Sequence, residues 1–108
     1  MKYEPITFDG RTLTFWKSTY SYGDCLAVGC DCEDGPYAVV TVNVDPKNNE
    51  PLMNERCAYM DTNDACDLVL LMERLGIIKP TYGLGFSGFC CYPEYEFDAE
   101  WLSGITEY

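Results

Sequence analysis

The stretch DTNDACDLVLLMERLG, residues 61–76, decides the fold class, because it carries the clearest helical period in the chain. Its apolar residues recur at i, i+3, i+4 and i+7, which places on one helix face Leu68, Leu71, Met72 and Leu75. Polar residues at its start offer caps and negative charge for a helix N-terminus. Gly76 is typical of a helix C-terminus. The pattern predicts one amphipathic helix over about 63–75.

Upstream of this helix, short β-prone segments alternate with turn residues. Asp9-Gly10 is a typical tight hairpin turn, and Asp34-Gly35-Pro36 is a second turn signal. The run Tyr37 to Val44 is rich in β-branched residues. The predicted strands are 6–8, 11–17, 26–32, 37–44 and 56–60, with a turn over 20–24 and a loop over 45–55.

Downstream of the helix, the glycine-rich segment 82–88 leads into a predicted final strand, 89–97. Residues 83–88 match G-x-G-x-x-G, but a dinucleotide site needs a strand before this motif and a helix after it. We therefore interpret the glycines as a bend or bulge entering the last strand. The whole chain, 1–108, is predicted to be a single α+β domain. It would hold an antiparallel sheet of about five to six strands, with one main helix packed on one face.

The balance of charge is strongly acidic. Lys and Arg number 7 against 18 Asp and Glu, which gives a net charge of −11. Such a charge repels nucleic acid and anionic membranes, so we expect neither as a direct partner. The chain has no histidine, the commonest general base, and its serines and cysteines lack that activating partner. We therefore expect a protein that is not an enzyme and that uses no cofactor.

Seven cysteines form no metal-binding pattern with standard spacing. An odd number, together with an N-terminus that lacks an apolar leader, argues against a disulfide framework and favours a cytoplasmic protein. The longest apolar run, 68–72, is far shorter than a membrane helix requires. We expect most of the cysteines to be small buried hydrophobes. A thiolate metal site remains the alternative.

Four acids alternate with apolar residues near the C-terminus, at Glu94, Glu96, Asp98 and Glu100. If this segment is extended, the acids stand on one face, about 6.6–6.8 Å apart, and could imitate a row of nucleic-acid phosphates. A simpler interpretation is a half-buried edge strand whose charges prevent edge-to-edge pairing. If Asp98 begins a helix instead, the row is interrupted after Glu96.

A second acidic cluster lies at the predicted hairpin turn and consists of Asp31, Glu33 and Asp34. Tyr92 and Tyr95 are candidate anchors for a partner, because tyrosine offers a large contact area at little entropic cost. The simpler view is that most of the tyrosines fill a small β core.

Residues 58–64, AYMDTND, and 87–97, SGFCCYPEYEF, resemble a family of small uncharacterised proteins carried on mobile elements of gut bacteria, mainly Firmicutes. This resemblance carries no catalytic or binding residues across. What it implies is a setting on a plasmid, conjugative element or phage. Small acidic proteins in that setting are often inhibitors of host defence, including anti-CRISPR and antirestriction DNA mimics.

Two functional hypotheses follow. In the first, the chain is a non-enzymatic inhibitor that docks its acidic surface onto the basic groove of a nucleic-acid-binding protein. In the alternative, it is an accessory or regulatory protein of a mobile element and binds a protein partner through an apolar patch. Salt should weaken the first kind of binding and leave the second nearly unchanged.

Overall fold

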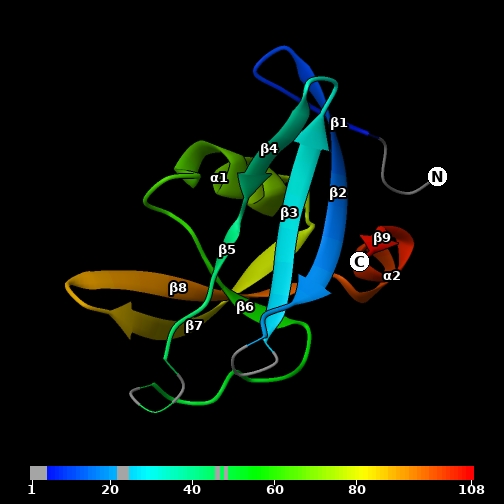
Figure 1. Ribbon diagram of the computed structural model, residues 1–108. Coiled ribbons are helices and arrows are strands. Elements are labelled where there is room, and N and C mark those ends of the chain that lie inside the picture. Colours follow the sequence, from blue (N-terminus) through cyan, green and yellow to red (C-terminus); the bar gives the residue numbers. More distant parts are fainter. Residues whose placement is uncertain (1–4, 22–24, 46, 48) are drawn as a thin grey trace.

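The computed structural model describes residues 5–21, 25–45, 47 and 49–108. It confirms an α+β protein built mainly from antiparallel strands, here arranged in two sheets (Figure 1). The strands are β1 (Ile6–Phe8), β2 (Arg11–Thr19), β3 (Leu26–Cys32), β4 (Gly35–Val39), β5 (Thr41–Val42), β6 (Cys57–Met60), β7 (Ile78–Ser87), β8 (Cys90–Phe97) and β9 (Thr106–Glu107). The helices are α1 (Cys66–Arg74) and α2 (Ala99–Gly104).

The first sheet has the order β1-β2-β3-β4, and β9 adds to β2 as a parallel strand. The second sheet has the order β5-β6-β8-β7, so that β7 forms one of its edges. Val40 joins the two sheets: its N–H donates to Val28 of β3 and its carbonyl accepts from Asp61, after β6. The predicted run 37–44 is therefore divided between two sheets. The predicted turn over 20–24 falls partly on residues 22–24, which lie outside the described residues.

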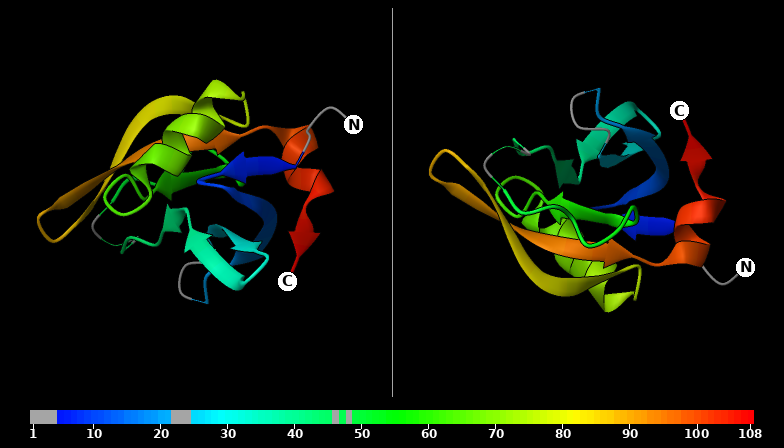
Figure 2. Two further views of the ribbon diagram at one scale, coloured as in Figure 1. Left: turned by 90° about the horizontal axis from the view of Figure 1, so that it is seen from above. Right: turned by 90° about the horizontal axis from the view of Figure 1, so that it is seen from below.

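Both sheets and the two helices contribute to one core. Figure 2 shows these elements from above and from below. Phe97 of β8 is fully buried at its centre, where its ring stacks on Trp101 of α2 at 5.8 Å between centroids. Phe15 of β2 meets the same Trp101 ring edge-on at 5.3 Å. The α2 turn thus ties the end of the second sheet to the first.

Helix α1 begins three residues later than predicted. The Asp61 carboxylate accepts from the N–H groups of Asn63 and Asp64, and this stabilises a turn ahead of the helix instead of capping it. At the other end, the Gly76 stop is confirmed. Gly76 has φ +77°, its N–H donates to Glu73, and the next N–H donates to Met72, which is a Schellman motif.

The buried face of α1 also differs in part from the prediction. Leu68 and Met72 are buried as expected, and Val69 is buried beside them. Leu75, predicted on the same face, is 50% exposed, because it is the C-cap at which the helix ends.

The largest departure from the predicted fold is β7. The glycine-rich segment, predicted as a bend or bulge entering the last strand, forms the outer half of a long strand that pairs with β8. An irregularity does occur, but it lies inside β7, where the register shifts between Pro80 and Leu84. Gly85 is required by packing, because a Cβ there would lie 2.8 Å from the Tyr59 ring.

Candidate functional site

The four predicted acids do not form one exposed row. Asp98 caps α2, where its carboxylate accepts from the N–H of Trp101 at 3.0 Å, so the strand ends at Phe97. Glu100 then lies exposed in the first turn of that helix. The expected spacing of a phosphate row is therefore interrupted after Glu96, because a helical cap competes with continued extension.

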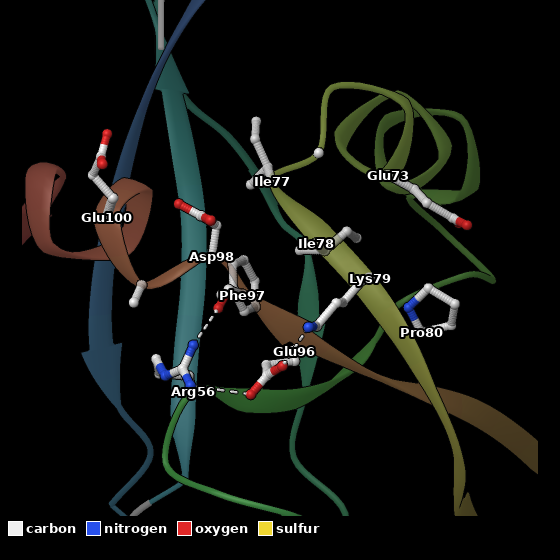
Figure 3. A pocket seen from close by; sticks show the side chains of 12 residues that line it. Arg56, Glu73, Ile77, Ile78, Lys79, Pro80, Glu96, Phe97, Asp98 and Glu100 are labelled. Atoms are coloured by element: carbon white, nitrogen blue, oxygen red, sulfur yellow. Dashed lines mark hydrogen bonds and ion pairs between the residues drawn. The ribbon is translucent and has the colours of Figure 1, made fainter. Parts of the chain in front are cut away.

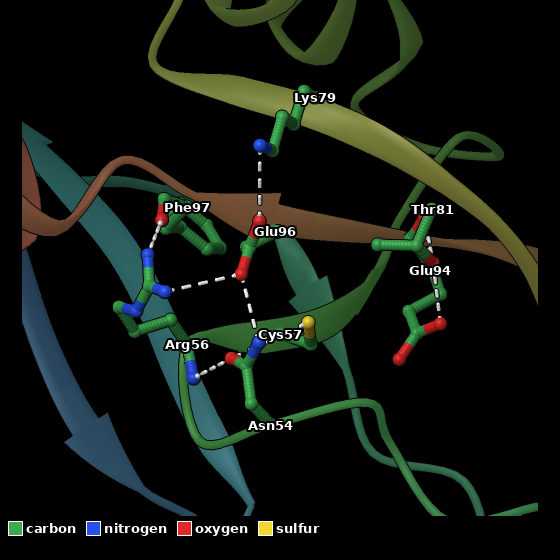
Figure 4. Close-up of polar contacts among 8 residues, drawn as sticks. All are labelled: Asn54, Arg56, Cys57, Lys79, Thr81, Glu94, Glu96 and Phe97. Atoms are coloured by element: carbon green, nitrogen blue, oxygen red, sulfur yellow. Dashed lines mark hydrogen bonds and ion pairs between the residues drawn. The ribbon is translucent and has the colours of Figure 1, made fainter.

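Glu94 is buried, with 6% of its surface exposed, and serves the fold. One carboxylate oxygen accepts from the N–H of Met53 at 2.8 Å, and the other accepts from the hydroxyl of Thr81 (Figure 4). The Met53 bond attaches the 49–54 loop to the second sheet, and the Thr81 bond joins β7 to β8. The prediction that Glu94 is available on an outer face is thus wrong.

Glu96 is surrounded by polar partners from other parts of the chain (Figure 4). Its carboxylate accepts from the side-chain amide of Asn54 at 2.7 Å and forms ion pairs with Arg56 at 3.2 Å and Lys79 at 3.4 Å. The Asn54 bond lowers the pKa of Glu96 most, against an opposing effect of burial. Lys79 and Arg56 lower this pKa further. The carboxylate is thus neutralised by its own chain.

At about pH 7, Glu96→Gln is expected to lower the free energy of unfolding by about 1 kcal/mol, because a neutral amide holds the two cations less well. The lowered pKa of Glu96 means that the unfolded state takes up the proton first as pH falls. The stabilisation is therefore present above the ordinary pKa of 4.5 and is lost as pH falls through the lower value of the folded protein. Urea unfolding across this range should show the gap between wild type and variant closing in acid.

The exposed Glu55 offers a matched control, because Glu55→Gln removes the same charge without touching this network. If the difference in the free energy of unfolding between wild type and Glu96→Gln does not change with pH, the lowered pKa of Glu96 is contradicted.

Three of the predicted acids, Glu96, Asp98 and Glu100, do come together around an open groove of about 720 Å³ (Figure 3). Arg56 and Lys79 line the same groove, which therefore presents both signs of charge. The second acidic cluster lies on other elements, at the β3–β4 turn. There Glu33 and Asp34 are exposed and Asp31 is half-buried, and Glu33 accepts from the N–H of Thr12 at 3.2 Å.

Of the two candidate tyrosine anchors, Tyr95 serves the fold. Tyr95 is 9% exposed, and its hydroxyl donates to Glu73 of α1 at 2.8 Å. Burial, together with this bond, raises the pKa of Tyr95 to about 12. Tyr92 is half-buried opposite Gly85. The core interpretation thus holds for Tyr95, which cannot act as an exposed anchor.

Among the described residues, the largest group of exposed apolar side chains lies where the sequence predicted only a bend or bulge. Beyond α1, the β7–β8 hairpin projects from the body as an arm (Figures 1 and 2). We call its four exposed apolar side chains the arm patch: Tyr82 (88% exposed), Leu84 (51%), Phe86 (54%) and Phe89 (fully exposed). The alternation Y-G-L-G-F was the available signal, since every second residue is apolar.

The strand register places Leu84 and Phe86 of the arm patch on one face of the hairpin. Leu84 pairs with Pro93 and Phe86 with Cys91, so Pro93 and Cys91 lie on that face as well. The other face carries Gly85, packed under the Tyr59 ring. Tyr82 sits in the bulge at φ +71°, a strained conformation for an aromatic residue, and points its ring into solvent.

The cysteines are less buried than predicted. None of the seven forms a disulfide, and only Cys30 and Cys57 are buried. Burial raises the pKa of Cys30 to about 11 and also raises that of Cys57, which makes both poor nucleophiles. Cys66 and Cys91 are exposed. In the described part of the chain, no three histidine, cysteine or acidic side chains form a group that could hold a metal ion.

No helix among the described residues is long and apolar enough to cross a membrane.

Comparison with known proteins identifies a family but no function. Neither the curated proteins nor the solved structures gave a match. Residues 14–107, nearly the whole chain, match the model of a family described as a domain of unknown function, DUF4313. The chain therefore belongs to this uncharacterised family, the domain of unknown function DUF4313.

Proposed function

We propose that the chain is a non-enzymatic interaction protein that binds a protein partner through the arm patch. The observation that carries this proposal is the exposure of Tyr82, Leu84, Phe86 and Phe89 on a hairpin that projects from the body. Monomeric soluble proteins rarely expose a large contiguous apolar surface, and here Leu84 and Phe86 lie side by side on one face. Aromatic side chains are also enriched where proteins bind one another.

The charge of the chain indicates the kind of partner. With a net charge of −11, the chain would attract a protein whose apolar site is surrounded by Lys and Arg. Long-range attraction then speeds the encounter, whereas apolar contact at the arm supplies affinity. In this proposal, the acidic residues raise the rate of association, and the arm patch determines how long the partner stays bound.

The acidic-mimic hypothesis is a second candidate, supported by the exposed carboxylates of Glu33, Asp34 and Glu100. It would use fewer acids than the sequence suggested, because Glu94 is buried and Glu96 is paired. In either form, we propose that the protein acts in the cytoplasm as the product of a mobile element, in the setting implied by the resemblance. Seven cysteines, none of them in a disulfide, suit a reducing compartment.

The test is a capture experiment from the lysate of a gut Firmicute, with the wild-type chain and a Leu84→Ser/Phe86→Ser variant as baits. Compared with the wild-type bait, the variant is expected to capture about tenfold less of the partner, because it lacks two apolar anchors. Washes at high salt should leave the wild-type complex largely intact, since apolar contact is not screened.

The matched control is Leu70→Ser/Leu75→Ser, which changes two exposed apolar residues, one in α1 and one at its C-cap, away from the arm. It should capture as much partner as wild type does. Equal capture by the arm variant would sink the proposal. If salt or added DNA displaces the partner, and Glu33→Gln/Asp34→Asn/Glu100→Gln loses it, the acidic mimic is the correct function.

A further inference from the structure

At the outer edge of β7, the backbone of Phe86 forms two hydrogen bonds with one side chain, that of Asn49. The side-chain amide of Asn49 accepts from the Phe86 N–H at 2.7 Å and donates to the Phe86 carbonyl at 3.1 Å. A neighbouring strand would make the same pair of bonds with this residue. One side chain from the 45–55 loop thus occupies the place of an added strand.

The same edge continues at Leu84. Residues two apart in a strand direct their backbone groups to the same side, so the N–H and carbonyl of Leu84 face outward, as those of Phe86 do. The residue opposite Leu84 is Pro93, which has no N–H to give to β7. This pair is therefore of the type that makes no hydrogen bonds between β7 and β8.

We propose, building on the proposed function, that this edge of β7 binds an extended basic segment of the partner as an added strand. The added strand would take the place of the Asn49 amide at Phe86 and pair with Leu84 beside it. Main-chain bonds supply much of the affinity in this mode of recognition, and alternate side chains supply specificity. Apolar side chains of the segment would then lie against the arm patch.

The charge next to the edge favours a basic occupant over a second copy of the chain. Glu50 follows Asn49 directly, and Asp45 lies in the same loop, where its carbonyl accepts from the Asn49 amide. Lys47 is the cation described in that loop. Two copies would each bring a net charge of −11, so their mutual repulsion opposes pairing edge to edge.

The test uses a capped peptide of about eight residues in which lysine and valine alternate, added to the full chain at millimolar concentration. Amide hydrogen exchange of Leu84 is expected to slow about tenfold on binding, because its N–H gains a main-chain acceptor. The control peptide has the same side chains and N-methylated amides, so it keeps the charge and loses the donors. It should bind weakly and leave the exchange of Leu84 unchanged.

Two variants of the chain test whether the Asn49 amide occupies the place of an added strand. Asn49→Ala should speed exchange of the Phe86 amide in the free protein and strengthen peptide binding several-fold, since nothing has to be displaced. Leu84→Pro should abolish binding and keep the fold, because an edge strand tolerates proline where its N–H faces outward. The melting temperature of each variant checks its fold.

The outcomes separate this inference from the function on which it rests. Equal binding of the N-methylated peptide, or unchanged exchange of Leu84, would overturn strand addition. If capture in the lysate still depends on the side chains of Leu84 and Phe86, the proposed function would stand without it. Concentration-dependent dimerisation of Asn49→Ala would show instead that the edge takes a second copy.

Discussion

Phe97→Ala is expected to lower the free energy of unfolding by about 3–5 kcal/mol, the largest loss for any single truncation proposed for this chain. The Phe97 ring is fully buried and stacks on Trp101, which in turn contacts Phe15 of the other sheet. Truncation removes the apolar transfer energy and leaves a cavity that three rigid elements cannot easily close. Urea unfolding followed by tryptophan fluorescence measures the effect.

Phe89→Ala is the matched control, because it makes the same chemical change on a fully exposed ring. Its effect should stay within about 0.5 kcal/mol. A small loss for Phe97→Ala, comparable with that of the control, would contradict the position of Phe97 at the centre of the core.

The parts of the fold that sequence reasoning predicted are those determined by neighbours in the chain. Gly76 after an amphipathic run indicates a helix end, and the Schellman bonds that form there are local. Asp98 likewise caps its own helix within three residues. Strand boundaries at Asp9-Gly10 follow from the turn itself.

The missed parts depend on residues distant in the sequence. From the sequence alone, Gly85 suggests a break in a strand. In the structure it lies within β7, and the position is a glycine because the Tyr59 ring occupies the space that a Cβ would fill. No Lys or Arg follows Lys79 in the sequence, yet Arg56 reaches Glu96 from 40 residues upstream. The acidic row was therefore predicted from spacing alone, whereas its exposure was decided by tertiary partners.

The exposure of the arm patch could not be predicted from the sequence either. The alternation of Leu84 and Phe86 with glycines was visible in the sequence, but alternation does not say which face is covered. Only the pairing of these residues with Pro93 and Cys91, and the packing of Gly85 on the opposite face, shows that the apolar side is left in solvent.

Glu94→Ala is expected to lower the free energy of unfolding by about 2–3 kcal/mol, because it deletes the acceptor for two donors in a part-buried site. Those donors are the N–H of Met53 and the hydroxyl of Thr81. Glu94→Gln should recover most of the loss. Its amide oxygen can accept from Met53, and its NH₂ can donate to the Thr81 oxygen, which itself can donate to the Glu94 carbonyl.

Comparing the two variants separates hydrogen bonding from charge, and Glu55→Gln in the same loop controls for charge at an exposed position. Urea unfolding gives the stabilities, and amide exchange of Met53 reports on the loop directly. Because the 49–54 loop also carries Asn49, its loosening in Glu94→Ala should speed exchange of the Phe86 amide at the β7 edge. If Glu94→Ala is as stable as wild type, or if Phe86 exchanges at the wild-type rate, the buried carboxylate does not hold the loop against the arm.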